Sequence, residues 1–134
     1  MKLRVLSEAN CRGLLDMAAA IDIQAEAFAL LAEGESVQGL RSFAISEDPP
    51  GIAIFNPSVL RSGRGYGVKV ISDFYENEKH GATRMTGLVA LFDGTTGYPT
   101  TVMEAGYLTD LRTGAGTGLA ARYLARPNSR AVAI

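Results

Sequence analysis

Apolar and polar residues follow a helical period in the first quarter of the chain. A short strand around "LRV" precedes Ser7, which is placed to cap a brief helix over residues 8–15. Asp16 is placed to cap a second helix over "MAAAIDIQAEAFALLAEGE", and Gly34 stands where a glycine commonly follows a helix. The apolar positions of this second helix recur at helical spacing: Ile21, Ala25, Phe28 and Leu31 or Ala32.

Beyond residue 35 the pattern changes to that of strands. A polar loop leads to the strand-like "RSFAIS", and the turn residues "PPG" at 49–51 precede a strand "IAIF". The segment "GYGVKVISDFYE" has the composition of a central strand. Residues 85–106 predict a hairpin, because two apolar runs flank the turn residues of "DGTTG".

The last part of the chain predicts a helix followed by a strand. "YLTDLRTGAGTGLAARYLARP" is rich in Ala, Gly and Thr, so another segment must pack close to this helix, and Pro127 ends it. Residues 129–134, "SRAVAI", then have the pattern of a buried strand with no turn behind it. The order of elements predicts an α+β fold in which an α/β unit begins at the end of the sequence.

Composition limits the classes of partner. The 134 residues form one domain by length, and a formal charge of -1 gives no electrostatic reason to expect nucleic acid or an anionic membrane. Cys11 and His80 are single residues of their kinds, which excludes an internal disulfide and a Cys/His zinc set. A lone thiol suits a reducing cytoplasm, and no 18-residue apolar run or signal peptide is present.

Three positively charged residues lie in segments whose other residues are mainly apolar or small. Lys69 lies between valines in "GVKVIS", Arg112 lies in the first turns of a small-residue helix, and Arg41 precedes a strand-like stretch. Arginine and lysine in such settings can hold a carboxylate. Taken singly, each is more often a solvated side chain. Only their convergence in space would favour a binding site.

The other polar candidates have simpler interpretations. His80 reads as an exposed loop residue, and Cys11 as a small packed side chain. Asp93 and Asp110 read as a turn residue and a helix-start residue. The glycine run "GRGYG" is not followed by a helix, so it does not predict a phosphate site.

Several motifs together resemble the ornithine cyclodeaminase/mu-crystallin family. They are the strand end "LFD", the turn "TGYP", the helix motif "LTDLRT" with its Ala/Gly-rich continuation, and "ARYLARPNSRAVAI". "GVKVIS" and the opening "VLSE…LLDM…AIDIQAEAFALLAEG" are similar as well. The resemblance covers nearly the whole chain, and the helix motif is its specific part.

The resemblance implies roles for four residues. Arg41, Lys69 and Arg112 match positions that grip the substrate carboxylate, Arg112 also lies near the cofactor, and Thr83 is the nearest match to a cofactor-contacting threonine. The cofactor of the family is NAD(P), and the chemistry is hydride transfer at the α-carbon of an amino or imino acid. The family's catalytic aspartate has no match within these 134 residues.

The resemblance also implies an organisation. Residues 1–108 would form a substrate-binding and dimerisation domain, with amino-terminal helices packed on a mostly antiparallel sheet. Residues 109–134 would supply a linking helix and the first strand of a Rossmann domain, whose glycine-rich turn would follow. We therefore expect an amino-terminal portion of the enzyme, inactive alone and forming a homodimer or larger assembly. The alternative is a non-catalytic, mu-crystallin-like ligand-binding or oligomerising protein.

Overall fold

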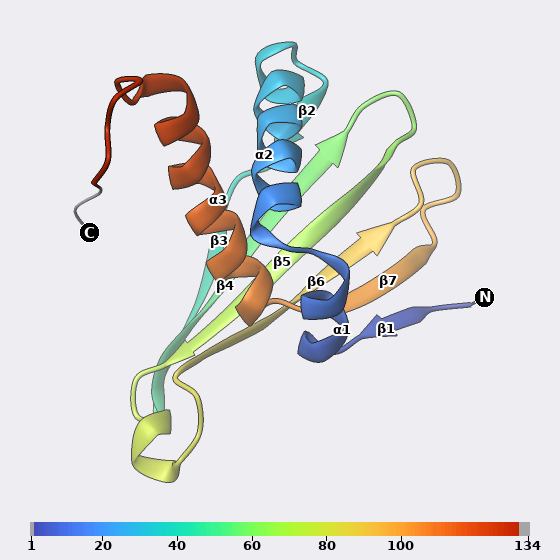
Figure 1. Cartoon of the computed structure of the whole chain (residues 1–134). Helices are drawn as coiled ribbons and strands as arrows, with labels where there is room; N and C mark the ends of the chain where they lie inside the picture. Colours follow the sequence, from blue (N-terminus) through green and yellow to red (C-terminus); the bar gives the residue numbers. More distant parts are fainter. Residues whose placement is uncertain (1, 132–134) are drawn as a thin grey trace.

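Three helices lie on one face of a seven-stranded sheet, as Figure 1 shows. The computed structural model describes residues 2–131. The helices are α1 (Glu8–Leu14), α2 (Met17–Ala32) and α3 (Gly106–Leu124), with a short 3-10 helix η1 (Asn77–His80). The predicted α+β class is confirmed. The strands are β1 (Arg4–Leu6), β2 (Ser36–Gln38), β3 (Ser42–Glu47), β4 (Pro50–Leu60), β5 (Gly65–Phe74), β6 (Met85–Phe92) and β7 (Pro99–Glu104).

The helix boundaries follow the capping residues that the sequence predicts. Ser7 and Asn10 form a reciprocal capping box at the start of α1. The side chain of Asp16 accepts a hydrogen bond of 2.9 Å from the backbone N–H of Ala19 at the start of α2. Gly34 follows the end of α2 with a φ of 75°, in the left-handed region where glycine is favoured. Both helices therefore begin for local reasons, and α2 also ends for one.

The sheet places β5 near its centre. The strand order is β1-β7-β6-β5-β4-β2, and β3 also pairs with β4. Only β1 and β7 run parallel; the other pairs are antiparallel. Lys69 on β5 lies between Asn56 of β4 and Val89 of β6. The predicted central strand and the predicted hairpin of β6 and β7 are both confirmed.

Three local expectations differ from the structure. The turn before β4 lies at residues 48–49, and Pro50 is the first residue of the strand, where its missing N–H is tolerated. The expected polar loop contains β2, which is too short to give a periodic signal and forms by pairing with the end of β4. Of the expected strand at 129–134, residues 129–131 are not in a strand, and residues 132–134 lie outside the described residues.

A cluster of buried residues lies between α2 and α3. Ala20, Leu111 and Ala115 form this small core, and Ile21 packs against it. A Cβ added at Gly118 of α3 would lie 2.8 Å from the Cδ1 atom of Ile21. The small residues of α3 thus allow α2 to approach closely, as the sequence predicts. No helix among residues 2–131 has the length and apolar character needed to cross a bilayer.

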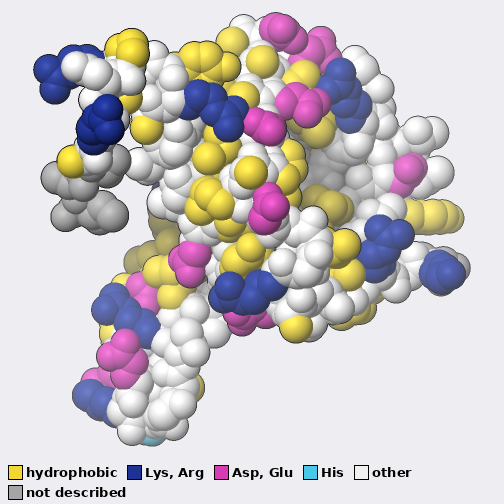
Figure 2. Space-filling model, in the orientation of Figure 1, with side chains coloured by type: hydrophobic (Ala, Val, Ile, Leu, Met, Phe, Trp, Pro, Cys, Tyr) yellow, Lys and Arg dark blue, Asp and Glu magenta, His cyan; other side chains and the backbone are white. Residues whose placement is uncertain are grey.

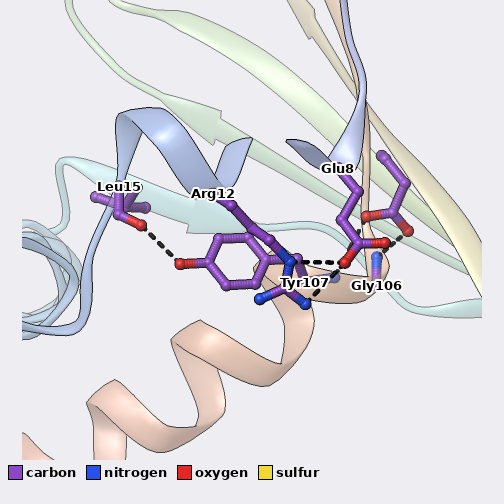
Figure 3. Close-up of polar contacts among 6 residues, drawn as sticks. Glu8, Arg12, Leu15, Gly106 and Tyr107 are labelled. Carbon is purple, nitrogen blue, oxygen red and sulfur yellow. Dashed lines mark hydrogen bonds and ion pairs between the residues drawn. The ribbon is translucent and has the colours of Figure 1, made fainter. Parts of the chain in front are cut away.

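Polar contacts fix the start of α3 against α1 (Figure 3). The Tyr107 hydroxyl donates a 2.7 Å hydrogen bond to the backbone carbonyl of Leu15. The guanidinium of Arg12 lies 4.2 Å from the centre of the Tyr107 ring and pairs with Glu8 at 2.7 Å. The carboxylate of Glu104 accepts hydrogen bonds from the first backbone N–H groups of α3. These contacts hold α3 in a defined position over the sheet.

Tyr107→Phe tests the contribution of this anchor. Removal of the hydroxyl leaves the Leu15 carbonyl without its partner, and we expect a loss of about 1 kcal/mol in the free energy of unfolding. Tyr123→Phe on the same helix is the control, because Tyr123 is 73% exposed. Urea unfolding of both variants measures the difference. Equal stabilities for the two would show that the Tyr107 hydroxyl does not anchor α3.

Candidate functional site

A cavity of about 510 Å³ lies between the helices and the centre of the sheet, and all three candidate cations line it. Lys69 enters from β5, Arg112 from α3, and Arg41 from the segment before β3. The fold therefore brings together residues that are far apart in the sequence. The cavity also contains neutral polar side chains: Gln24, Gln38, Asn56, Ser58 and Thr109.

The cavity is electropositive because its cations lack acidic partners. No aspartate or glutamate lines it within the described part of the chain, and the ion pairs found there involve other arginines and lysines. Partial burial, with Arg112 and Arg41 nearby, holds the pKa of Lys69 below its ordinary value. A bound anion would relieve both the repulsion and the cost of burial. The site is therefore suited to a carboxylate.

Asn56 belongs to this site, although the sequence did not single it out. Its side-chain carbonyl accepts a 2.7 Å hydrogen bond from Nε of Arg41. This bond leaves the two terminal nitrogens of Arg41 available for a ligand. Asn56 pairs with Lys69 across β4 and β5, and that register is visible only in the sheet. An asparagine inside the apolar run "IAIFNPS" was the available signal.

Asn56→Asp places a carboxylate among the three cations. We expect the new charge to pair with Arg41 and compete with a bound anion, which weakens carboxylate binding by about tenfold or more. The same pairing stabilises the unliganded chain. Calorimetric titration with a carboxylate and thermal unfolding measure both effects. Asn128→Asp is the matched control, because Asn128 is exposed; unchanged affinity in Asn56→Asp would contradict the assignment.

Thr83 lies in a different cavity from the three cations. That cavity, of about 530 Å³, is lined by Thr83 together with Glu8, Glu104 and Asp110. Thr109 lines both cavities, so they adjoin at α3. The neighbouring Arg84 is paired with Asp73 at 2.8 Å, which gives it a structural role. The cofactor contact of Thr83 stays a prediction.

The remaining candidates have the simple roles that the sequence favours. Cys11 is buried, and burial together with Glu104 and Glu8 raises the pKa of its thiol, so the reactive thiolate is disfavoured. His80 is exposed at the tip that carries η1, among the charged side chains seen in Figure 2. The carboxyl of Asp93 accepts hydrogen bonds from the Thr96 hydroxyl and from the backbone N–H groups of Thr96 and Thr95, and these bonds lower its pKa. No cluster able to hold a metal ion occurs among residues 2–131.

The comparisons with known proteins identify the family of the chain. The model of the ornithine cyclodeaminase/mu-crystallin family matches residues 1–134. Delta(1)-pyrroline-2-carboxylate reductase of Bacillus cereus is 32% identical over 130 residues, which cover 97% of this chain and 40% of that protein. The chain thus spans about 40% of the length of this curated relative.

Two solved structures share the fold. The Delta(1)-pyrroline-2-carboxylate reductase of Thermococcus litoralis, in complex with NADH and L-proline, aligns with a TM-score of 0.87 and 34% identity. The alignment covers 95% of this chain and 39% of that one. An archaeal alanine dehydrogenase, described as a dimer with bound NAD, aligns with a TM-score of 0.88 and 33% identity, covering 96% and 39%.

Proposed function

Because the chain belongs to the ornithine cyclodeaminase/mu-crystallin family, we propose that it forms the substrate-binding part of an NAD(P)-dependent enzyme acting on an α-amino or imino acid. Arg41, Lys69 and Arg112 hold the substrate carboxylate. The observation that carries the proposal is their convergence in one cavity that has no acidic side chain among the described residues. Residues 1–108 form most of this part, and the linking helix at the start of residues 109–134 adds Arg112 to the site.

The three cations would do different work on a carboxylate. Arginine presents a planar fork that matches two carboxylate oxygens, whereas lysine acts as a point charge. The bond from Arg41 to Asn56 fixes one fork before a ligand arrives. A carboxylate held from the sheet and from α3 at once leaves its α-carbon in a defined place. Such positioning is the main requirement for transfer of a hydride to or from that carbon.

The described residues fit one end of the cofactor. NAD(P), when bound, supplies or accepts the hydride at the α-carbon. A pyrophosphate needs free N–H groups at a helix start, but those of α3 are occupied by Glu104. The cavity of Thr83 is lined by three carboxylates and by Arg12, which is paired with Glu8, and the remaining negative charge suits the nicotinamide end and not the phosphates. We assign this contact to Thr83, and to Arg112 from the adjoining cation cavity.

The relatives carry out different reactions on related acids. Those matched are named as pyrroline-2-carboxylate reductases, an alanine dehydrogenase and ornithine cyclodeaminases. A carboxylate beside the reacting carbon is common to their named substrates, so the three cations serve any of these reactions. A cytoplasmic setting is part of the same proposal, and the free thiol of Cys11 fits a reducing compartment.

We further propose a homodimer formed through the face of the sheet that lacks helices. Val68 and Val70, the neighbours of Lys69 on β5, point to this face, opposite to Lys69. Tyr66 stacks there on Phe92 with ring centres 4.8 Å apart. Leu88 of β6 pairs with Val70 there and is 41% exposed. Apolar side chains in a continuous sheet face favour association with a second copy.

Leu88→Glu tests the dimer. We expect the charge to disrupt the apolar face and to convert the protein to a monomer in light scattering, because a buried carboxylate without a partner is costly. Leu31→Glu on α2 is the matched control, since Leu31 is also 41% exposed but lies on a helix. A monomeric unchanged protein would contradict the proposal, as would a dimer that survives Leu88→Glu.

Titration of the protein with L-proline, followed by NMR, tests the carboxylate site directly. We expect shifts of amide signals around Lys69 and Arg112 that saturate with ligand. Prolinamide is the control, because it keeps the ring and lacks the carboxylate. Absence of saturable binding by L-proline, or equal binding by prolinamide, would overturn the proposed function.

A further inference from the structure

A second cavity, of about 460 Å³, continues from the cation site along the same face of the sheet. The two cavities share four lining residues, Asn56, Ser58, Lys69 and Val89. A ligand held by Lys69 would therefore lie at the junction between them. From there the second cavity extends towards the loop that joins β4 and β5, where Arg64 marks its far end.

Two glycines of β5 make this hollow. Gly67 lies two residues before Lys69 and so faces the same side of the sheet, and Gly65 lines the cavity further along. A Cβ added at Gly67 would lie 3.0 Å from Cδ2 of Leu91, which shows that the Leu91 side chain lies on this face too. Any larger residue at position 67 would fill part of the space beside Lys69. The floor of the cavity is therefore backbone, with side chains only at its walls.

The walls near Lys69 are apolar on the β6 side, whereas Asn56 and Ser58 line the β4 side. Leu60, Val89 and Leu91 come from β4 and β6 on either side of the glycines. The charged residues lie at the far end, where Asp93 is engaged by the backbone of its own turn. The space on the β6 side of Lys69 thus offers burial for a hydrocarbon group, and no second charged side chain among the described residues lines it there.

We infer that this second cavity is the subsite for the ligand's substituent, and that the chain selects carboxylic acids whose apolar substituent is larger than a methyl group. This inference rests on the proposed carboxylate site, since Lys69 places the ligand at the junction. The carboxylate stays on the cations while the hydrocarbon part lies over Gly67 and against Leu91. Acids of alanine size would leave the subsite empty.

A series of simple carboxylates tests the subsite on the whole chain. Acetate, butyrate and 3-phenylpropionate carry the same charge and differ in apolar size, and NMR titration gives the dissociation constant of each. Burial of each methylene is expected to tighten binding by up to about fourfold. We therefore expect 3-phenylpropionate to bind at least about tenfold more tightly than acetate.

Leu91→Trp fills the subsite and provides the decisive variant. We expect it to remove the advantage of 3-phenylpropionate while leaving acetate affinity unchanged, so that retained acetate binding also reports a folded site. Leu31→Trp on α2 is the matched control, because Leu31 is 41% exposed, close to the 39% of Leu91, and lines neither cavity. Leu91→Ala removes a wall without filling the space. This variant should reduce the ratio of 3-phenylpropionate affinity to acetate affinity by a few fold.

The outcomes separate the two proposals. Equal affinities for acetate and 3-phenylpropionate in the unchanged protein would overturn the subsite and leave the carboxylate site standing. The subsite would also be overturned if Leu91→Trp kept the full ratio of 3-phenylpropionate affinity to acetate affinity. If none of the carboxylates binds, the proposed function fails, and the subsite fails with it.

Discussion

Lys69→Met is expected to weaken carboxylate binding by about 10- to 100-fold, because it removes one charged partner of a partly buried anion. The same change should raise the midpoint of thermal unfolding in the absence of ligand. Lys69 is half-buried beside Arg112 and Arg41 without an acidic partner, so its charge opposes folding until an anion binds. Loss of binding together with a gain in stability distinguishes a site residue from a structural one.

The pH dependence follows from the direction of the pKa shift. The pKa of Lys69 is lower in the folded than in the unfolded chain, so the unfolded chain holds its proton to higher pH. The free energy of unfolding should therefore rise with pH through the window between these two pKa values. This increment should be absent from Lys69→Met. Urea unfolding across the alkaline range measures it.

Lys79→Met is the matched control for this prediction. It removes the same charge from η1, where Lys79 is exposed and paired with Glu76. We expect carboxylate affinity to stay unchanged in this variant, with at most a small loss of stability. If Lys69→Met bound carboxylates normally, or if it destabilised the unliganded chain, the assignment of Lys69 to the site would be wrong.

Leu111→Ala is expected to remove a large part of the stability of the fold. Leu111 is 6% exposed and joins α3 to Ala20 of α2 in the small core. Truncation of a buried leucine costs about 2–5 kcal/mol, against a total of about 5–15 kcal/mol for an ordinary domain. Because so few side chains are well buried among residues 2–131, little other packing is available to compensate.

Leu124→Ala on the same helix controls for helix propensity. Leu124 is 82% exposed, and its truncation should change the free energy of unfolding by less than about 0.5 kcal/mol. Urea unfolding of the two variants, followed by circular dichroism, measures the difference. Similar stabilities would mean that the contact of α2 with α3 does not hold the fold together.

The sequence predicts those parts of the fold that local chemistry decides. Ser7 and Asp16 begin helices because their side chains satisfy free N–H groups, and this depends on neighbours three residues away. The hairpin of β6 and β7 follows from its turn residues. β2 could not be predicted in this way, because three residues are too few to show an alternation of apolar and polar positions. The strand forms through its pairing with β4.

The sequence predicts which residue types form the site but not how they are arranged in space. Lys69 is conspicuous between valines, but its partnership with Asn56 depends on the register of β4 against β5. Arg41 reaches the cavity from a loop, and Arg112 from a helix whose position depends on contacts with α1 and α2. The family resemblance already assigned the three cations to one site, and the structure shows that they line one cavity. Only the folded chain shows that Thr83 lines a different cavity from the three cations.

The parallel pairing of β1 with β7 has a consequence for how the chain folds. Arg4 lies opposite Thr101, so the first strand finds its partner only after nearly a hundred further residues. Closing so long a loop is slow, because entropy is lost before the contact is gained. During synthesis the antiparallel strands β4, β5 and β6 can pair first, while β1 stays unpaired until β7 has been made. The segment made first is therefore among the last to take its place.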